Sequence, residues 1–191
     1  MQFDRQEILP GMIVHTRSDE IYGRLIQYGI GSWGNHDAIL IKRGDMYLVG
    51  ESVWPRARTV PLDEYAAYIT RTGRQTRVYW PTHATGVEGM AASLWWEHNV
   101  DGTWYDVRGV VRLGYKAAWM KWFCRWPVFR RHYPVVKESE WAWWCTEGVS
   151  PAWTAARGYP VWQKVHPTPL TTEHRVADGT LQDLSEFVVR A

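Results

Sequence analysis

The sequence predicts a fold of the α+β class. Apolar and β-branched runs typical of strands occur along the chain together with segments whose apolar residues recur at helical spacing. Two of the β-rich runs flank Arg43-Gly44-Asp45, a sequence typical of the turn in an antiparallel hairpin. We therefore expect an antiparallel sheet with helices packed on it.

The N-terminal part predicts a short strand followed by a helix. Residues 12–17 form an apolar, β-branched run that is typical of a strand. Ser18 then begins a segment in which Ile21 and Leu25 lie at helical spacing, and Gly29 ends it. A short loop leads to the predicted hairpin.

Two polar residues of the hairpin are candidates for chemistry, and both lie at the end away from the turn. His36 begins its first strand, and Glu51 lies near the end of its second strand. The rest of the chain predicts a short helix over 63–73, a strand over 75–81, helices over 85–98 and 107–123, a loop over 125–140, a helix from about Cys145 and, after mostly loop, a terminal helix over 181–190.

The composition describes an ordinary globular domain. The 191 residues fit one domain, and 46% hydrophobic with 22% charged residues indicates a chain that folds. A net charge of +2 disfavours nucleic acid as a partner. Two cysteines indicate a reducing compartment. Because neither a signal peptide nor a transmembrane segment is seen, we expect a cytoplasmic location.

The two cysteines differ in their surroundings. Cys145 comes just ahead of a predicted helix, where free backbone N–H groups favour a thiolate. Cys124 lies in an aromatic helical stretch that suits a buried, inert thiol. The contrast favours Cys145 as a nucleophile, although two structural cysteines would also fit the residues, and we expect no disulfide between them.

Three blocks of the chain resemble the circularly permuted NlpC/P60 cysteine hydrolases. Residues 11–41 are similar to the family's opening block, in which a histidine begins a hydrophobic strand, and His36 has that place. Residues 45–52 resemble the next strand, whose final acidic or polar residue orients the histidine, which matches Glu51. Residues 143–153 resemble the block that carries the nucleophile, which matches Cys145.

The resemblance implies a fold and a mechanism. The fold would be a papain-like sheet of five or six antiparallel strands, permuted so that the histidine strand precedes the cysteine helix, in a single domain over 1–191 with a Trp-rich helical insertion at about 85–138. His36 would take the proton of Cys145, Glu51 would hold the imidazole, and the Cys145 backbone N–H would help to form the oxyanion hole. The implied substrate is a peptide or another amide, including peptides derived from peptidoglycan.

Two alternatives to amide hydrolysis stay open. The same Cys/His dyad occurs in permuted acyltransferases and thioesterases that act on lipid acyl groups, and a non-enzymatic ligand-binding module is a third possibility. Most of the 14 tryptophans lie between Trp80 and Trp162, so they build either the core or a ligand-stacking groove, and at least one of Trp141, Trp143 and Trp144 is expected to border the cleft.

No cofactor or metal is expected. The chain has neither a CxxC pair nor HExxH, and it lacks the glycine-rich motifs that bind nucleotides. The remaining histidines are expected to be structural: His15, His83, His98, His132, His166 and His174.

Overall fold

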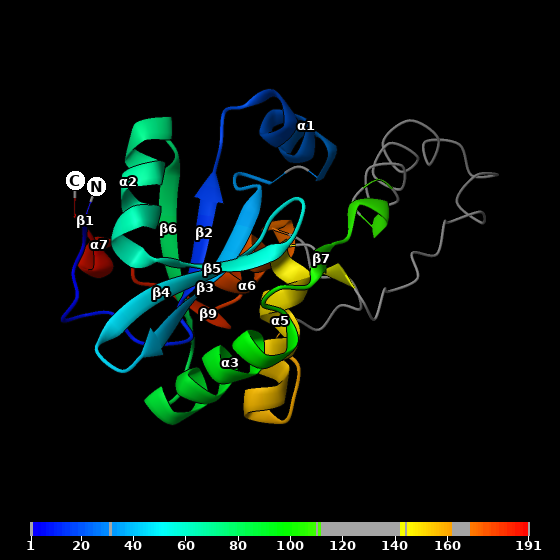
Figure 1. The fold of residues 1–191 in the computed structure, drawn as a ribbon. Helices are drawn as coiled ribbons and strands as arrows, with labels where there is room; N and C mark the ends of the chain where they lie inside the picture. Colours follow the sequence, from blue (N-terminus) through cyan, green and yellow to red (C-terminus); the bar gives the residue numbers. More distant parts are fainter. Residues whose placement is uncertain are drawn as a thin grey trace.

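A six-stranded antiparallel sheet forms the centre of the protein. We analysed a computed structural model that describes residues 2–30, 32–109, 111, 142–143, 145–161 and 169–190. The sheet has the order β5-β4-β3-β2-β6-β9 (Figure 1). Its strands are β2 (Ile13–Arg17), β3 (His36–Arg43), β4 (Met46–Ser52), β5 (Ala57–Pro61), β6 (Gln75–Pro81) and β9 (Leu181–Asp183). The α+β class and the expected number of strands are confirmed.

The predicted hairpin is formed by β3 and β4. The register pairs Arg43 with Met46 next to the turn and Ala38 with Glu51 at the other end. Gly44 in the turn has a φ of 60°, a left-handed conformation that glycine adopts without strain. Strand β5, which the sequence pattern did not predict, adds to the free edge of β4 and pairs Arg58 with Glu51.

The described residues also form two small two-stranded sheets. Strands β1 (Gln2–Phe3) and β10 (Val189–Arg190) pair antiparallel and hold the two ends of the chain together (Figure 1). Strands β7 (Trp104–Tyr105) and β8 (Ala142–Trp143) pair in parallel. The second pair brings residues 104–105 next to the segment that leads into Cys145.

The helices named for the described residues are α1 (Ile21–Ile30), α2 (Leu62–Thr72), α3 (Gly86–Asn99), α5 (Cys145–Arg157), α6 (Pro169–Ala177) and α7 (Ser185–Val188). Two of them show clear end signals. Helix α2 ends at Gly73, whose left-handed backbone donates to the carbonyls of the last turn. Helix α3 begins with a capping box in which Thr85 and Glu88 satisfy each other's backbone N–H groups.

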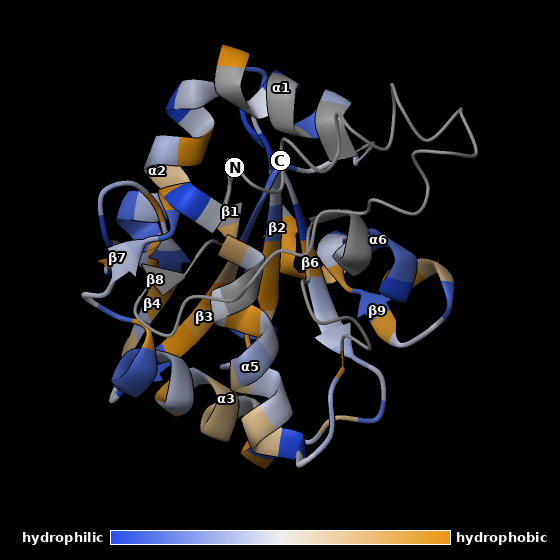
Figure 2. Cartoon of the chain, turned by 90° about the vertical axis from the view of Figure 1, so that its right-hand side faces the viewer, coloured by the Kyte–Doolittle hydropathy of each residue, from blue (hydrophilic) through white to orange (hydrophobic). Residues whose placement is uncertain are grey.

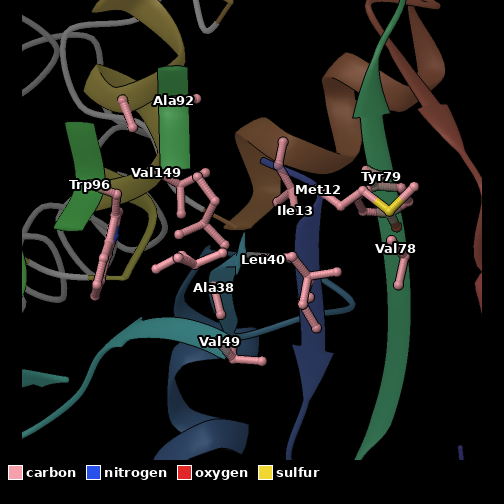
Figure 3. Close-up of a cluster of buried hydrophobic side chains, with 14 of the residues drawn as sticks. Met12, Ile13, Ala38, Leu40, Val49, Val78, Tyr79, Ala92, Trp96 and Val149 are labelled. Carbon is pink, nitrogen blue, oxygen red and sulfur yellow. The ribbon is translucent and has the colours of Figure 1, made fainter. Parts of the chain in front are cut away.

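One part of the core lies between the sheet and the helix pair α3/α5, and buried residues of α2, namely Leu62, Tyr65 and Ile69, belong to the same core. Helices α3 and α5 pack against each other and against β3 and β4. Trp96 and Val149 approach the strands that carry Ala38, Leu40 and Val49 (Figure 3). Figure 2 shows the apolar residues of β2 and β3 in the interior between the helices. Such close packing of apolar side chains is the main stabilising contribution to the fold.

The C-terminal part corrects the sequence prediction. Helix α6 occupies a stretch that was expected to be loop, and the expected terminal helix over 181–190 is instead β9, the four-residue α7 and β10. Leu181 is buried while Gln182 and Asp183 are exposed, so this short stretch gains its strand character from pairing with β6. The expected loop over 125–140 and most of the helix over 107–123 lie outside the described residues.

Candidate active site

Cys145 lies at the start of a helix, as expected. It is the first residue of α5, its thiol is free, and it is 8% exposed. The first backbone N–H groups of a helix have no partner within the helix, so they can stabilise an anion formed there. Its Sγ lies 3.8 Å from Thr146 Oγ1. Cys124 lies outside the described residues.

His36 and Glu51 share one face of the hairpin. Glu51 is opposite Ala38 in the β3/β4 register, and alternate residues of a strand point the same way, so His36 points to the side of Glu51. His36 Nε2 lies 3.2 Å from Glu51 Oε2. Asp37 lies on the opposite face of β3. Gly50, which pairs with Ile39 in β3, shares that face, and a Cβ on Gly50 would lie 2.6 Å from the ring of Trp96 in α3. Helix α3 therefore covers this face.

Arg58 completes the surroundings of Glu51. Its Nε and Nη2 donate to Glu51 Oε1 at 2.8 and 2.6 Å, across the β4/β5 pair. Glu51 is only 2% exposed, so both of its oxygens are buried with charged partners. A buried carboxylate is costly unless it is paired in this way.

The electrostatics of the site favour a charged histidine. Burial by itself lowers the pKa of His36, but its hydrogen bonds to Cys145 and Glu51, together with the charges of both, outweigh burial and raise the pKa to about 10. Burial by itself raises the pKa of Glu51, whereas His36 and Arg58 bring it below its usual value. The structure therefore places His36 beside Glu51, and the influence of Cys145 on the pKa of His36 puts the thiol in the same neighbourhood.

A second group of buried polar residues lies beside this site. His15 in β2 is fully buried, and its Nδ1 lies 2.6 Å from Asp37 Oδ1. The other oxygen of Asp37 accepts from Thr146 Oγ1 at 2.5 Å and from Thr172 Oγ1 at 3.1 Å. His15 Nε2 lies 3.3 Å from Glu173 Oε1 in α6.

Pairing of opposite charges shifts the pKa values of His15, Asp37 and Glu173. Burial by itself lowers the pKa of His15, but Asp37 and Glu173 raise it to about 9. Burial by itself raises the pKa of Asp37, and His15 and Thr146 bring it below its usual range. Glu173 has its pKa lowered to about 2 because bonds from His15, Ser32 and the Gly34 backbone outweigh its burial.

The sequence interpretation missed this second group. It assigned His15 a structural role and gave Asp37, Thr146 and Glu173 no role at all. One signal was available, because His15 and Asp37 are polar residues inside apolar strands, and such residues need buried partners. No such signal exists for Glu173, which comes from a helix 158 residues after His15.

The tryptophans divide between the core and the surface. Trp96 and Trp153 are almost fully buried, whereas Trp54 and Trp104 are 75% and 57% exposed. Arg56 lies over the Trp104 ring at 4.2 Å. Of the three tryptophans expected to border the cleft, Trp141 and Trp144 lie outside the described residues, and only the backbone of Trp143 is described.

A ligand cavity, a metal site and a membrane span each require particular features of the described residues. A surface cavity of about 450 Å³ is lined by Arg77, Asp183, Ser185, Glu186 and Phe187, at the other edge of the sheet from Glu51. Within the described ranges, no three or more His, Cys, Asp or Glu side chains are grouped as metal ligands would be. No helix in the described part of the chain has the length and apolar character needed to span a bilayer.

Comparisons with known proteins leave the family open. No protein-family model and no curated protein matches the chain. Among solved structures, the metalloprotein yiiX from Escherichia coli O157:H7 is similar to it, with 16% identity, a TM-score of 0.46, and a match covering 88% of this chain and 81% of that chain.

Proposed function

We propose that this protein is a cysteine hydrolase that cleaves amide bonds with Cys145 as nucleophile, His36 as acid and base, and Glu51 as the residue that orients His36. One observation carries the proposal: His36 lies 3.2 Å from the buried Glu51 carboxylate, and its neighbour Asp37 is bonded to Thr146, the residue that follows Cys145 at a helix start. A thiol, an imidazole and an orienting carboxylate are the parts that thiol catalysis requires.

The geometry assigns a role to each ring nitrogen of His36. Nε2 faces Glu51, so Nδ1 is the nitrogen left for the thiol of Cys145. A carboxylate at Nε2 keeps a proton on that nitrogen and leaves Nδ1 free to accept one from sulfur. Arg58 holds the other oxygen of Glu51, which fixes the direction of the carboxylate.

The reaction would follow two steps. In the first, Nδ1 of His36 takes the Cys145 proton, which gives a thiolate beside a charged imidazolium; sulfur then bonds to the carbonyl carbon, and the C–N bond breaks as His36 gives that proton to the leaving amine. In the second, water gives a proton to His36 and attacks the thioester, so that the C–S bond breaks, a carboxylic acid leaves, and His36 returns the proton to the Cys145 sulfur. The backbone N–H of Cys145 would stabilise the oxyanion in both steps.

The order of the elements supports a permuted papain-like architecture for this mechanism. The histidine and its carboxylate come from β3 and β4, and the nucleophile follows them in the chain on α5. Helix α5 packs on β3 and β4, and Thr146 in its first turn is bonded to Asp37, the residue after His36. Peptides, including those derived from peptidoglycan, are the substrates we propose.

An activated ester tests the proposal without knowledge of the natural substrate. Incubation with p-nitrophenyl acetate should release nitrophenolate and leave an acetyl group on Cys145, located by peptide mass spectrometry. Cys145→Ala should abolish this acylation, while Cys124→Ser should leave it intact. Equal acylation of the Cys145→Ala variant, or no acylation of the folded wild-type protein, would contradict the proposal. Cleavage of peptidoglycan-derived peptides, detected by chromatography, would then test the amide substrate.

A further inference from the structure

The residues that follow His36 and Cys145 in the chain are bonded to each other. Asp37 comes directly after His36, and Thr146 directly after Cys145, and Thr146 Oγ1 donates to Asp37 Oδ2 at 2.5 Å. One hydrogen bond therefore ties the backbone beside the base to the backbone beside the nucleophile. Because Asp37 points away from the face that carries His36, this bond involves neither of the two reacting side chains.

Asp37 is itself held on both oxygens. Its Oδ1 contacts His15 Nδ1 at 2.6 Å, and the two residues are directly opposite in the β2/β3 register. The rings of Trp33 and Tyr79 both lie 5.6 Å from the His15 ring, measured between centroids. The position of Asp37 is therefore fixed from the rigid centre of the sheet.

The loop that leads into His36 is held by the same group. Glu173 Oε1 accepts from Ser32 Oγ and, at 2.9 Å, from the Gly34 backbone N–H, and it also contacts His15 Nε2. A Cβ on Gly34 would lie 2.1 Å from His15 Nε2, so the loop backbone packs directly on the imidazole. Through Glu173, helix α6 is therefore bonded both to the loop before His36 and to His15.

Stability alone gives little reason for such a group. His15, Asp37 and Thr146 are each at most 1% exposed. Apolar side chains of similar volume often stabilise an interior as well as a buried ion pair does. Catalytic groups, in contrast, need to be held within about 0.5 Å of their working geometry by supporting hydrogen bonds.

We propose that Asp37 and Thr146 are positioning residues that fix the Cys145 thiol relative to His36, with His15 and Glu173 anchoring them. This inference rests on the proposed function, since it assumes that Cys145 and His36 react together. Neither Asp37 nor Thr146 touches the substrate in this scheme. Their effect passes through the two backbone segments that carry the reacting side chains.

A pair of matched variants separates positioning from stability. Thr146→Val and Thr172→Val each remove one hydroxyl that donates to the same oxygen of Asp37, but only Thr146 is joined to the nucleophile. Both should lower the melting temperature, because each leaves a buried carboxylate with one donor fewer. Only Thr146→Val should slow the reaction of Cys145.

The measurement is the rate at which iodoacetamide alkylates Cys145, followed by peptide mass spectrometry across a pH series. We expect Thr146→Val to alkylate about ten-fold more slowly than wild type and to have an altered pH profile, because a small misplacement of reacting groups has effects of this size. Thr172→Val should keep the wild-type rate and profile. Thr146→Ser, which retains the hydroxyl, should restore both.

The outcomes distinguish this inference from the proposed function. Wild-type Cys145 that reacts no faster than Cys124 contradicts the proposed function itself. Fast wild-type labelling with equal rates in the folded Thr146→Val and Thr172→Val variants overturns only the positioning role. If Thr146→Val does not fold, the pair Thr146→Ala and Thr172→Ala makes the same comparison without the added methyl group, and equal rates there overturn the inference.

Discussion

Replacement of Glu51 by glutamine tests the orienting role most directly. The change keeps the shape of the side chain but removes its charge and turns one acceptor oxygen into an NH₂ donor. Glu51 accepts from Arg58 on Oε1 and faces His36 Nε2 with Oε2. If the amide oxygen stays with Arg58, its NH₂ group faces His36 and favours the tautomer that carries its proton on Nδ1. That tautomer cannot accept the thiol proton.

The expected loss follows from the bond that is removed. A hydrogen bond to a charged group contributes about 1.5–3 kcal/mol. Because about 1.4 kcal/mol corresponds to a factor of ten in rate, kcat/KM should fall about ten- to hundred-fold. His36→Ala should cost more, since it removes the proton carrier itself. The assay is hydrolysis of p-nitrophenyl acetate, with circular dichroism to confirm that each variant is folded.

Arg58→Met serves as the matched control for Glu51→Gln. It removes the two bonds to Oε1 but leaves the contact between Oε2 and His36, and the Arg58 side chain is 55% exposed. Its loss of activity should therefore be smaller than that of Glu51→Gln. A folded Glu51→Gln variant with wild-type kcat/KM would show that Glu51 does not orient His36.

Two further predictions concern stability. The pKa of His15 is raised to about 9 from 6.5, so its stabilisation is complete below about pH 6.5 and is lost as the pH rises through 9. The pKa of Glu173 is lowered to about 2 from 4.5, so its stabilisation is present above about pH 4.5 and is lost as the pH falls through 2. The free energy of unfolding, measured with urea across a pH series, should therefore be greatest between about pH 4.5 and 6.5. His15→Asn should reduce the loss of this free energy on the alkaline side, and an unchanged dependence on pH there would contradict the prediction. Gly34→Ala forces a Cβ to 2.1 Å from His15 Nε2 and should cost about 1–3 kcal/mol or more, whereas Gly86→Ala, with no atom within 4 Å, should be neutral or stabilising, so equal melting temperatures would refute the packing argument.

The predictable parts of the fold are those with local causes. The β3/β4 hairpin depends on a turn at Gly44, and the end of α2 depends on the left-handed Gly73. Because His36 and Glu51 lie on the two strands of this hairpin, their meeting could be expected from one stretch of sequence. The place of Cys145 at a helix start could be expected in the same way.

The missed parts depend on partners distant in the sequence. Strand β5 contains Arg58, Thr59 and Pro61, a run with little β pattern, and it becomes a strand by pairing with β4. The pair between Glu51 and Arg58 follows from that pairing, so it was missed as well. The contact between His15 and Glu173 needs α6 to pack near β2, and local sequence carries no record of that packing.

In the proposed mechanism, the distance between the Cys145 thiol and His36 depends on the position of α5 as a whole. Near its first turn, Thr146 is bonded to Asp37, and a Cβ on Gly148 would lie 3.1 Å from Trp96 Nε1, so the helix lies close against α3. Towards its other end, Trp153 donates from Nε1 to the Gly11 carbonyl at 2.9 Å and stands edge-on to the Trp80 ring. A helix held at two separated points cannot slide or tilt without breaking one of them. The buried Trp96 and Trp153 therefore help to fix the position of α5, while the bond from Thr146 to Asp37 fixes its first turn, where Cys145 lies.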